Sequence, residues 1–580
     1  MKQNIKNTFN KIKNKRQIKT NLMGNASSEV CVNQNYVSQQ KINTNIFMVN
    51  FSFIQDNQYQ IAQLNNPQCQ NCMAFFNKYS ISNLIDQNEA TQFNKNLIQK
   101  AQTFFYQKAN QALHSEKLIW VCEFCYFPNI IENLDQQIVQ DAVNIQGYFE
   151  KTQQPQIKNA QQEQQQTQLE NFTKNSGEQL IYVLDNSGSM SSVESYVKNG
   201  GVVQLSRKQS VIQSIQEMSN QGNSLQNKEI QLIVFSDEVQ IYTNIQDKPH
   251  NVSSSSLNNW DQLIASVQGI QEQMVGVPAE QVNDLLTIYR KSNKMGSTAL
   301  GPAILSAVEI AKSNRGSQII LCTDGMANQG LGSISQQQQS TQFYQDVAQY
   351  AKQKGVQVSI IGIGDDKMGL QVIGKLAEKT NGSVFKIDLS NLNDKLDNIL
   401  QDKMIASDVK MKIFIHKNVV LEDRAKDDLE VDVGNATRES CITFEYLIQH
   451  PEELKDVSSI PFQAQIEYTD LNGQRQFIVV TKQIKTTQNA QEVDNNLNME
   501  IVEKRMAQKC ANLIKQGDAK QAKQYQQQWN SFVEKNDNYT DYQQQLKQQQ
   551  QMIEKLASEG ADNEKAQVQL QQMQQGKFWK

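Results

Sequence analysis

The chain has 580 residues, 38% of them hydrophobic, and its 56 basic side chains nearly balance 60 acidic ones. This length exceeds what one core can hold and predicts about two to four domains. The balanced charge gives no general case for nucleic-acid binding, and no apolar run approaches the roughly 18 residues of a membrane-spanning helix, so we expect a soluble protein.

The amino-terminal segment, residues 1–43, is predicted to be a basic arm without regular structure. Its first 22 residues hold seven basic side chains, no acidic one and no apolar core of a secretory signal. A transit peptide is one alternative. A start of translation at Met23 is another, because MGNASS would then be a complete motif for N-myristoylation of Gly24, with Cys31 available for a second acyl chain. A chance match inside a tail is the competing interpretation.

Two Cys-x-x-Cys pairs define the next region, residues 67–130: Cys69 with Cys72, and Cys122 with Cys125. Four thiolates form a closed tetrahedral set for structural Zn²⁺, which contributes on the order of 10 kcal/mol of local folding free energy. A redox dithiol is the alternative, but it needs only one pair, so two pairs favour zinc. Residues 90–114, between the pairs, have the pattern of a helical insertion.

The residues around these pairs resemble the zinc finger of Sec23/Sec24-type proteins. The matching positions are Pro67, Phe76, Asn77, Trp120 and Asn129. That finger belongs to the inner COPII coat, where it precedes a trunk of the von Willebrand factor type A kind, so the resemblance implies strands at residues 44–66 that join a β-sandwich. One departure is the gap of 49 residues between Cys72 and Cys122. The remaining cysteines are expected to be plain thiols in a reducing cytosol.

A Gln-rich linker is predicted at residues 131–176, where hydrophobicity is low. Beyond it, residues 177–405 alternate between two patterns. Apolar runs typical of buried strands lie at 180–184, 230–235, 319–322 and 356–363, and helical patterns lie at 204–218, 303–312, 342–354 and 370–379. This alternation predicts a doubly wound, mainly parallel sheet. In such sheets ligands bind outside the carboxyl ends of the strands.

Acidic and hydroxyl side chains follow two of these strands. Asp185 ends the first strand and is followed by Ser187 and Ser189, Asp324 ends the third strand, and Thr298 lies on a small-residue loop before a helix. Hard oxygen ligands of this kind suit Mg²⁺. For the Asp-x-Ser-x-Ser run alone, capping of a helix N-terminus is the alternative.

The five residues together resemble the metal-ion-dependent adhesion site of von Willebrand factor type A (VWA) domains, which have a Rossmann-like fold. The resemblance implies that Ser187 and Ser189 ligate Mg²⁺ (or Mn²⁺ or Ca²⁺) directly, that Thr298 does so directly or through water, and that Asp185 and Asp324 act mostly through water. It also implies an open coordination position that an Asp or Glu of a partner protein fills. COPII trunks generally lack an intact site of this kind.

Three further regions complete the chain. Residues 247–294 are polar, and we expect a surface excursion, with a rim to the metal face as the alternative. Short alternating runs in residues 406–492 predict an antiparallel β-sandwich. Apolar residues three or four apart in residues 493–580, interrupted at 517–518, predict a helical hairpin. The Gln-rich tail after Asn538 either forms a further helix or stays loose.

The sequence therefore predicts a multidomain α/β protein with a small zinc-ribbon-like finger, and as its function non-enzymatic intracellular scaffolding through Mg²⁺ and an acidic side chain of a partner. The alternative is a COPII-like coat subunit or trafficking adaptor, with coat components or a small GTPase as partners. In both cases we expect a cytoplasmic protein, peripheral on endomembranes or attached through lipidation. An enzyme is disfavoured because the P-loop lysine and the His-Glu-x-x-His motif are absent.

Overall fold

The structure, a computed structural model, describes residues 43–55, 67–85, 118–131 and 178–575, together with strands at 23–25 and 30–32. Short gaps interrupt the long range at 199–200, 222–224, 226, 243–244, 246–247, 274–275, 293–295, 335–336, 365–367, 388–391, 426–428, 455–456, 458, 488, 490–491, 494–496 and 560–562. The helical insertion expected at 90–114, the linker from residue 132 on and most of the basic arm lie outside the described residues.

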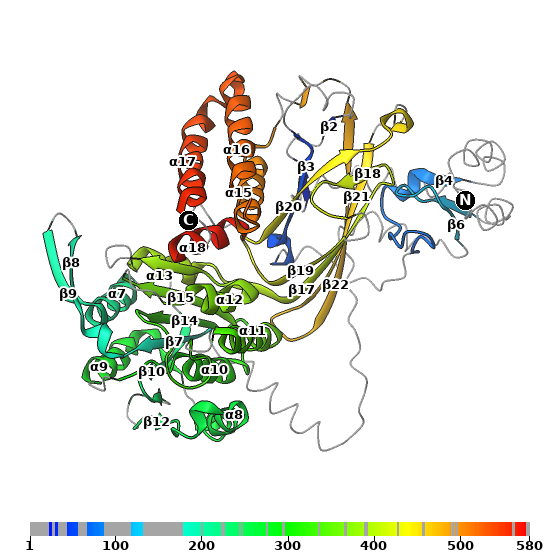
Figure 1. The fold of residues 1–580 in the computed structure, drawn as a ribbon. Coiled ribbons are helices and arrows are strands. Elements are labelled where there is room, and N and C mark those ends of the chain that lie inside the picture. The colour runs from blue at the N-terminus through cyan, green and yellow to red at the C-terminus, as the bar shows by residue number, and fades with distance from the viewer. Residues whose placement is uncertain are drawn as a thin grey trace, which may run out of the picture.

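An α/β domain is built on one sheet with the strand order β12-β11-β10-β7-β14-β15-β16 (Figure 1). Five neighbouring strands are parallel: β10 (Lys228–Phe235), β7 (Glu178–Asp185), β14 (Gln318–Thr323), β15 (Gln357–Ile363) and β16 (Val384–Ile387). Three antiparallel pieces, β11 (Val239–Tyr242), β12 (His250–Asn251) and β13 (Val277–Pro278), complete the sheet at the β10 side. The doubly wound, mainly parallel sheet expected from the alternating pattern is therefore confirmed.

Helices cover both faces of this sheet because its strands are apolar on both sides. In β7, Ile181 and Val183 belong to one core, whereas Leu180, Tyr182 and Leu184 belong to the other. The first core is covered by α8 (Trp260–Gln268), α10 (Leu300–Ala311), α11 (Gln337–Lys354) and α12 (Leu370–Thr380). The second is covered by α7 (Arg207–Gln221), α9 (Val282–Lys291) and α13 (Leu392–Gln401).

The expectation of a surface excursion at residues 247–294 was wrong. This segment contains α8 and α9, and their apolar residues fill both cores: Leu263 and Val267 on one side, Leu285, Leu286 and Tyr289 on the other. The buried residues stand three or four positions apart, so each helix hides one stripe behind a polar face. The polar average composition of the segment concealed this periodicity.

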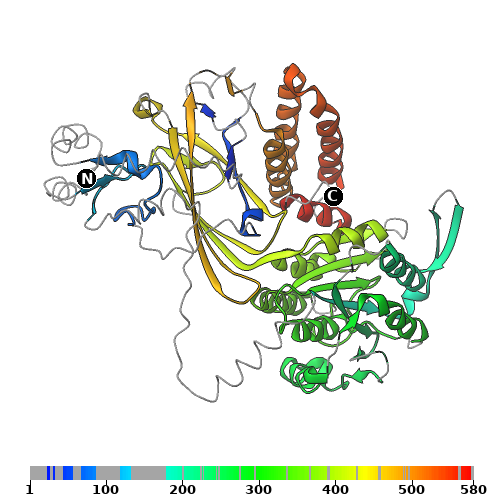
Figure 2. The same ribbon diagram turned by 180° about the vertical axis from the view of Figure 1, so that it is seen from behind.

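A second difference from the sequence prediction follows the Asp-x-Ser-x-Ser segment at residues 185–189. Residues 193–198 (β8, Val193–Lys198) and 201–206 (β9, Gly201–Ser206) form a two-stranded antiparallel hairpin. The helix expected from residue 204 therefore begins only at Arg207. The hairpin projects from the α/β domain, and the zinc-finger region lies at the opposite end of the molecule in both views (Figures 1 and 2).

A β-sandwich follows, as the alternating runs predicted. One sheet has the order β19-β17-β21-β22-β2 and the other the order β1-β3-β20-β18, and a shared apolar core lies between them. The strands are β1 (Met23–Asn25), β2 (Val30–Val32), β3 (Ile46–Asn50), β17 (Met404–Ile415), β18 (Val419–Leu421), β19 (Glu430–Thr437), β20 (Cys441–Ile448), β21 (Ser459–Thr469) and β22 (Arg475–Thr487). Gly24 lies in β1, opposite Met48, and Cys31 lies in β2, opposite Thr486.

Four helices end the chain. The expected hairpin is α15 (Met499–Lys515) and α16 (Ala519–Glu534), and the Gln-rich tail adds α17 (Gln543–Glu559) and α18 (Glu564–Gln574). Leu546, Ile553 and Leu556 of α17 are buried, which explains why the tail folds. Glu564 accepts hydrogen bonds from the backbone N–H groups of Gly369 (2.6 Å) and Leu370 (3.1 Å) at the start of α12. This cap joins the helices to the α/β domain.

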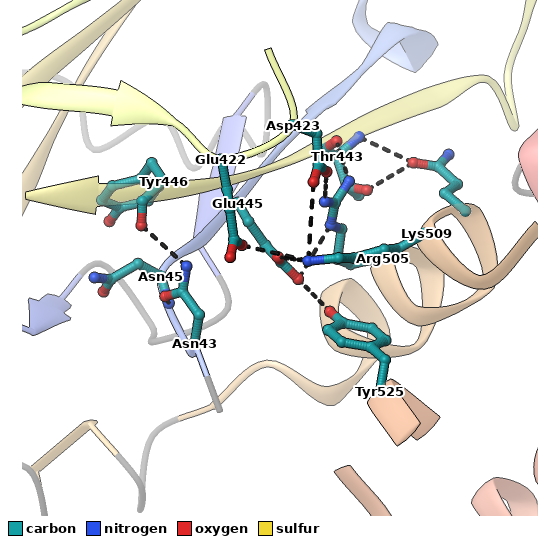
Figure 3. A network of polar contacts seen from close by, with 11 residues as sticks. Asn43, Asn45, Glu422, Asp423, Thr443, Glu445, Tyr446, Arg505, Lys509 and Tyr525 are labelled. Atoms are coloured by element: carbon teal, nitrogen blue, oxygen red, sulfur yellow. Dashed lines mark hydrogen bonds and ion pairs between the residues drawn. The ribbon is translucent and has the colours of Figure 1, made fainter. Parts of the chain in front are cut away.

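A polar network joins α15 to the sandwich (Figure 3). Arg505 and Lys509 of α15 reach the acidic cluster of Glu422, Asp423 and Glu445, and Tyr525 donates to the buried Glu445. A pocket of about 290 Å³ lies beside the network. Burial raises the pKa of Glu445 to about 8. Arg505 and Lys509 offset two of the three acids, and Glu445 favours its protonated form below its raised pKa, so we interpret the cluster as a structural contact between α15 and the sandwich.

Candidate functional site

The four predicted cysteine ligands lie together in the finger, next to the three-stranded sheet β4 (Leu84–Ile85), β5 (Leu118–Val121) and β6 (Pro128–Ile131). Cys69 Sγ is 3.5 Å from Cys125 Sγ, and Cys72 Sγ is 3.6 Å from Cys122 Sγ. All four sulfur atoms lie within 4.8 Å of one another. A zinc tetrahedron with Zn–S bonds of about 2.3 Å has sulfur separations of about 3.8 Å. The cluster therefore fits structural Zn²⁺.

Each cysteine pair forms the same tight turn. The residue after the second cysteine has a positive φ, 65° at Met73 and 62° at Tyr126. Its backbone N–H donates to the carbonyl of the first cysteine, at 2.9 Å to Cys69 and 2.8 Å to Cys122. The repeated strained conformation in non-glycine residues indicates that the surroundings hold both turns firmly.

The flanking residues that resemble the Sec23/Sec24-type finger have structural roles here. Asn77 Nδ2 (2.6 Å), Ser80 Oγ (2.8 Å) and Trp120 Nε1 (3.1 Å) all donate to the carboxylate of Glu123, which lies inside the second pair. Asn129 Oδ1 accepts from the backbone N–H of Gln70, inside the first pair. The flanking residues thus join the two turns. Sequence reasoning missed Glu123, because two of its three donors, Asn77 and Ser80, are more than 40 residues away in sequence.

The finger is packed against the sandwich. Gln463 of β21 makes two hydrogen bonds to the backbone of Phe75, through Oε1 (2.9 Å) and Nε2 (3.0 Å). Tyr126 Oη lies 2.9 Å from His416 Nε2, and the N–H of Lys417 donates to the carbonyl of Phe124. Because Tyr126 and Phe124 belong to the second cysteine turn, loss of the turn would also disturb this contact.

The second predicted site lies at the carboxyl ends of β7 and β14, which we call the metal face: Asp185, Ser187, Ser189, Thr298 and Asp324. Four of these residues form a connected set. Ser187 N donates to Asp185 Oδ1 (2.8 Å), Ser187 Oγ lies 3.1 Å from Ser189 Oγ, and Ser189 Oγ donates to Asp324 Oδ1 (2.7 Å). Three of the four are buried, whereas Ser189 is exposed.

Thr298 lies on the same sheet edge but is not hydrogen-bonded to the other four. The N–H of the next residue, Ala299, donates to the carbonyl of Ser236, just beyond β10, and Asn328 binds the Thr298 backbone in both directions. Gly296 makes this loop fit, because a Cβ there would lie 2.9 Å from the Cβ of Asp237. The threonine loop thus lies at the same sheet edge as the other four residues, with no hydrogen bond between Thr298 and those residues.

Three residues that contact the metal face were missed by sequence reasoning. Thr323 Oγ1 donates to Asp185 Oδ2 (2.5 Å), and the buried Tyr289 hydroxyl donates to the Asp185 carbonyl. Arg207 Nη1 lies 2.9 Å from Asp324 Oδ2. Thr323 could have been found, because it directly precedes Asp324. Arg207 begins a helix that was expected to start at residue 204, and Tyr289 lies in α9, which was not predicted.

Burial sets the electrostatics of this face. Desolvation raises the pKa of Asp185 to about 6, although hydrogen bonds from Thr323 and Ser187 oppose the rise. A bound cation acts in the same direction as those hydrogen bonds, since it favours the ionised carboxylate. Three hydroxyls and two carboxylates are the hard donors that Mg²⁺ prefers, so the residues fit this ion.

Apolar side chains are exposed on segments that follow the metal-face residues in the chain. Among the described residues, seven large hydrophobic side chains are exposed, and four of them come shortly after metal-face residues: Val193, Val197, Val202 and Met326. The first three belong to the β8–β9 hairpin and are about two-thirds exposed, and Met326 follows Asp324 by two positions. Such patches next to polar groups are typical of protein-binding surfaces.

The chain has relatives among known proteins, both in sequence and in structure. No protein-family model matches the chain. It is 29% identical over 426 residues to the curated "Circularly permutated Ras protein 1" of Dictyostelium discoideum, a match that covers 69% of this chain and 49% of that protein. The chain thus spans about half the length of the curated relative it matches.

Among solved structures, the human COPII-coat protein Sec24c aligns over 96% of this chain and 74% of its own, with a TM-score of 0.59 and 11% identity. The ArnB paralog VWA2 from Sulfolobus acidocaldarius aligns over 70% of this chain and 90% of its own, with a TM-score of 0.36 and 17% identity. The first likeness shows that this chain shares the fold of Sec24c. None of the described helices combines the length and apolar content that crossing a bilayer requires.

Proposed function

We propose that this chain is a non-enzymatic scaffold that binds a partner protein through a divalent cation, Mg²⁺, at the metal face. The partner supplies an Asp or Glu to the open coordination position. The observation that carries the proposal is the connected set of acids and hydroxyls at one sheet edge, followed directly in the chain by a hairpin with exposed apolar side chains. Polar groups and exposed apolar side chains together are typical of protein interfaces.

The roles within the face follow from burial and hydrogen bonding. Ser189 is exposed and Ser187 touches it, so these hydroxyls are the groups that a solvent-borne cation reaches first. Asp185 and Asp324 are buried below them and supply negative charge. Zinc at the four cysteines has a different role in this proposal: it closes the finger and keeps it packed on the sandwich.

The surroundings of the hydroxyls support binding over catalysis. A serine nucleophile needs a general base within hydrogen-bond reach. The three described histidines interact elsewhere: His250 with Ser266, His416 with Tyr126, and His450 with Glu452. Ser189 donates to Asp324 Oδ1, and the other oxygen of this acid accepts from Arg207, so both carboxylate oxygens already have partners.

The test is partner capture from a native extract with Mg²⁺ and with EDTA, using the full chain, Ser189→Ala and Asp185→Ala. We expect EDTA and both substitutions to abolish capture of the same proteins, while circular dichroism shows an intact fold. Asp237→Ala is the matched control, because Asp237 is an exposed acid on the neighbouring turn of the same sheet edge. Equal capture with Mg²⁺ and with EDTA would refute the proposal.

A second candidate function is a COPII-like coat or vesicle-trafficking adaptor, with coat components or a small GTPase as partners. The fold shared with Sec24c over nearly the whole chain favours it. It predicts a cytoplasmic protein that collects on endoplasmic-reticulum exit sites, and cell fractionation with imaging tests this. If Met23 is the true start, acylation of Gly24 would add a membrane anchor, and a native amino-terminal peptide that begins before Met23 would exclude it.

A further inference from the structure

A positively charged side chain, Arg207, contacts one acid of the metal face. Arg207 is the first residue of α7 and nine-tenths buried, and its guanidinium lies between two carboxylates. Nη1 is 2.9 Å from Asp324 Oδ2, and Nε is 2.6 Å from Glu194 Oε1. The Asp324 side chain is fully buried, whereas that of Glu194 is 30% exposed. One side chain thus connects an inner acid of the face with an outer acid on the β8–β9 hairpin.

The space for this guanidinium is built into the sheet. Gly364 follows β15 with a φ of +87°, and a Cβ there would lie only 2.7 Å from Arg207 Nη2. A positive φ and a close approach are the two situations that require glycine. The end of a neighbouring parallel strand therefore leaves room for the guanidinium beside Asp324.

The position of Arg207 has an electrostatic consequence for any bound cation. Asp324 Oδ1 accepts from Ser189, and Oδ2 accepts from Arg207, so both oxygens are occupied in the protein alone. A divalent cation at Ser187 and Ser189 would have to share Asp324 with a guanidinium of like charge. Glu194 gives Arg207 a second partner, so the side chain can release Asp324 and remain paired.

We propose that Arg207 is an internal counter-cation of the metal face. It neutralises Asp324 in the cation-free protein, competes with a divalent cation for this carboxylate, and passes to Glu194 when the cation binds. This inference rests on the proposed function and deepens it, because Glu194 belongs to the hairpin that carries Val193, Val197 and Val202. Cation binding is thereby linked to the apolar part of the partner-binding surface.

The test is a calorimetric titration of Mn²⁺, the probe, into the full chain and two variants. Arg207→Met removes the competing charge, and we expect Mn²⁺ to bind about tenfold more tightly, the size expected for a unit charge beside a divalent cation in water. Lys208→Met is the matched control. Lys208 is the next residue of α7 and contacts Asn186 Oδ1 (2.7 Å) and the Ser292 carbonyl (2.6 Å), with no acid of the face.

The outcomes separate this inference from the proposed function. Unchanged or weaker Mn²⁺ binding by Arg207→Met would overturn the inference, since Arg207 would then only position Asp324. If partner capture still required the cation in that case, the proposed function would stand. An equal gain in Arg207→Met and Lys208→Met would also overturn it, because general charge would explain the effect. No Mn²⁺ binding by any of the three proteins would refute both.

A second measurement keeps the inference testable if Arg207→Met does not fold. Glu194→Gln removes the outer partner of Arg207, which then stays on Asp324, and we expect Mn²⁺ affinity to fall by about threefold. Hydrogen exchange of the β8–β9 hairpin in the unmodified chain should change on addition of Mn²⁺, and this response should be lost in Glu194→Gln. A hairpin whose exchange is the same with and without Mn²⁺ would contradict the proposed link.

Discussion

The finger and the metal face are both built for a cation, but they differ in what neutralises their ligands. In the finger, four sulfur atoms lie 3.5–3.6 Å apart in pairs and contact mainly one another. At the metal face, Asp185 receives Thr323 and Ser187, and Asp324 receives Ser189 and Arg207. Among the described residues, no positively charged side chain contacts the sulfur atoms of the first site, whereas Arg207 contacts Asp324 at the second.

The charge that each site already contains determines how firmly we expect it to hold a cation. Four clustered thiols cannot ionise together without a cation, so we expect the finger to fold only with zinc. The metal face is already hydrogen-bonded and partly neutralised, so we expect it to fold without an ion and to bind one reversibly. Under the proposed function, the charge that the protein itself supplies would thus separate a permanent structural metal from an exchangeable recognition metal.

The largest expected effect is in the finger. Cys72→Ser should remove zinc and unfold the finger, with a local loss on the order of 10 kcal/mol. Atomic absorption should give one zinc per unmodified chain and none in the variant. Cys510→Ala is the control, since Cys510 is a buried thiol of α15 outside the cluster. Full zinc content in Cys72→Ser would show that the four cysteines do not act together.

A smaller effect is expected when Mg²⁺ is added to protein that retains its zinc. A ligand that binds only the folded state at about one hundred times its Kd stabilises it by about 2.7 kcal/mol. Thermal unfolding of the α/β domain should therefore shift upward with Mg²⁺, and Asp324→Asn should abolish the shift. The finger should be insensitive to Mg²⁺. A Mg²⁺ response that persists in Asp324→Asn would place the ion elsewhere.

The smallest effect concerns a buried acid outside both sites. Glu503 of α15 is buried, and burial raises its pKa from 4.5 to about 7. Since the folded state disfavours the ionised form, the free energy of unfolding should fall as pH rises between about 4.5 and 7. Glu503→Gln should therefore be more stable than the unmodified chain at pH 8, by on the order of 1 kcal/mol after solvent screening.

Paired melting curves at pH 4.5 and pH 8 measure this difference. Nearly equal stabilities at pH 4.5 are the internal control, because Glu503 is then protonated in the folded state and about half protonated in the unfolded state. A variant that is no more stable at pH 8 would mean that Glu503 is neutralised after all. In that case Glu503 would resemble Asp324, whose charge Arg207 offsets.

Local patterns were enough for the finger. The spacing of Cys69, Cys72, Cys122 and Cys125 specifies two turns, and each turn is made by backbone contacts within a few residues. The strands of the parallel sheet were likewise predictable, because a strand buried on both faces is a continuous apolar run. Helices α8 and α9 escaped prediction because their apolar stripes are diluted by polar residues.

The amino-acid sequence by itself determined the ligand types at both sites, the parallel sheet and the order of the regions, because each depends on residues close together along the chain. Only the tertiary structure decided what surrounds the ligands. Arg207 reaches Asp324, and Asn77 and Ser80 reach Glu123, across sequence separations that no periodicity encodes. Charge compensation depends on distance in space, so whether a site carries its own counter-charge becomes visible only in the folded chain.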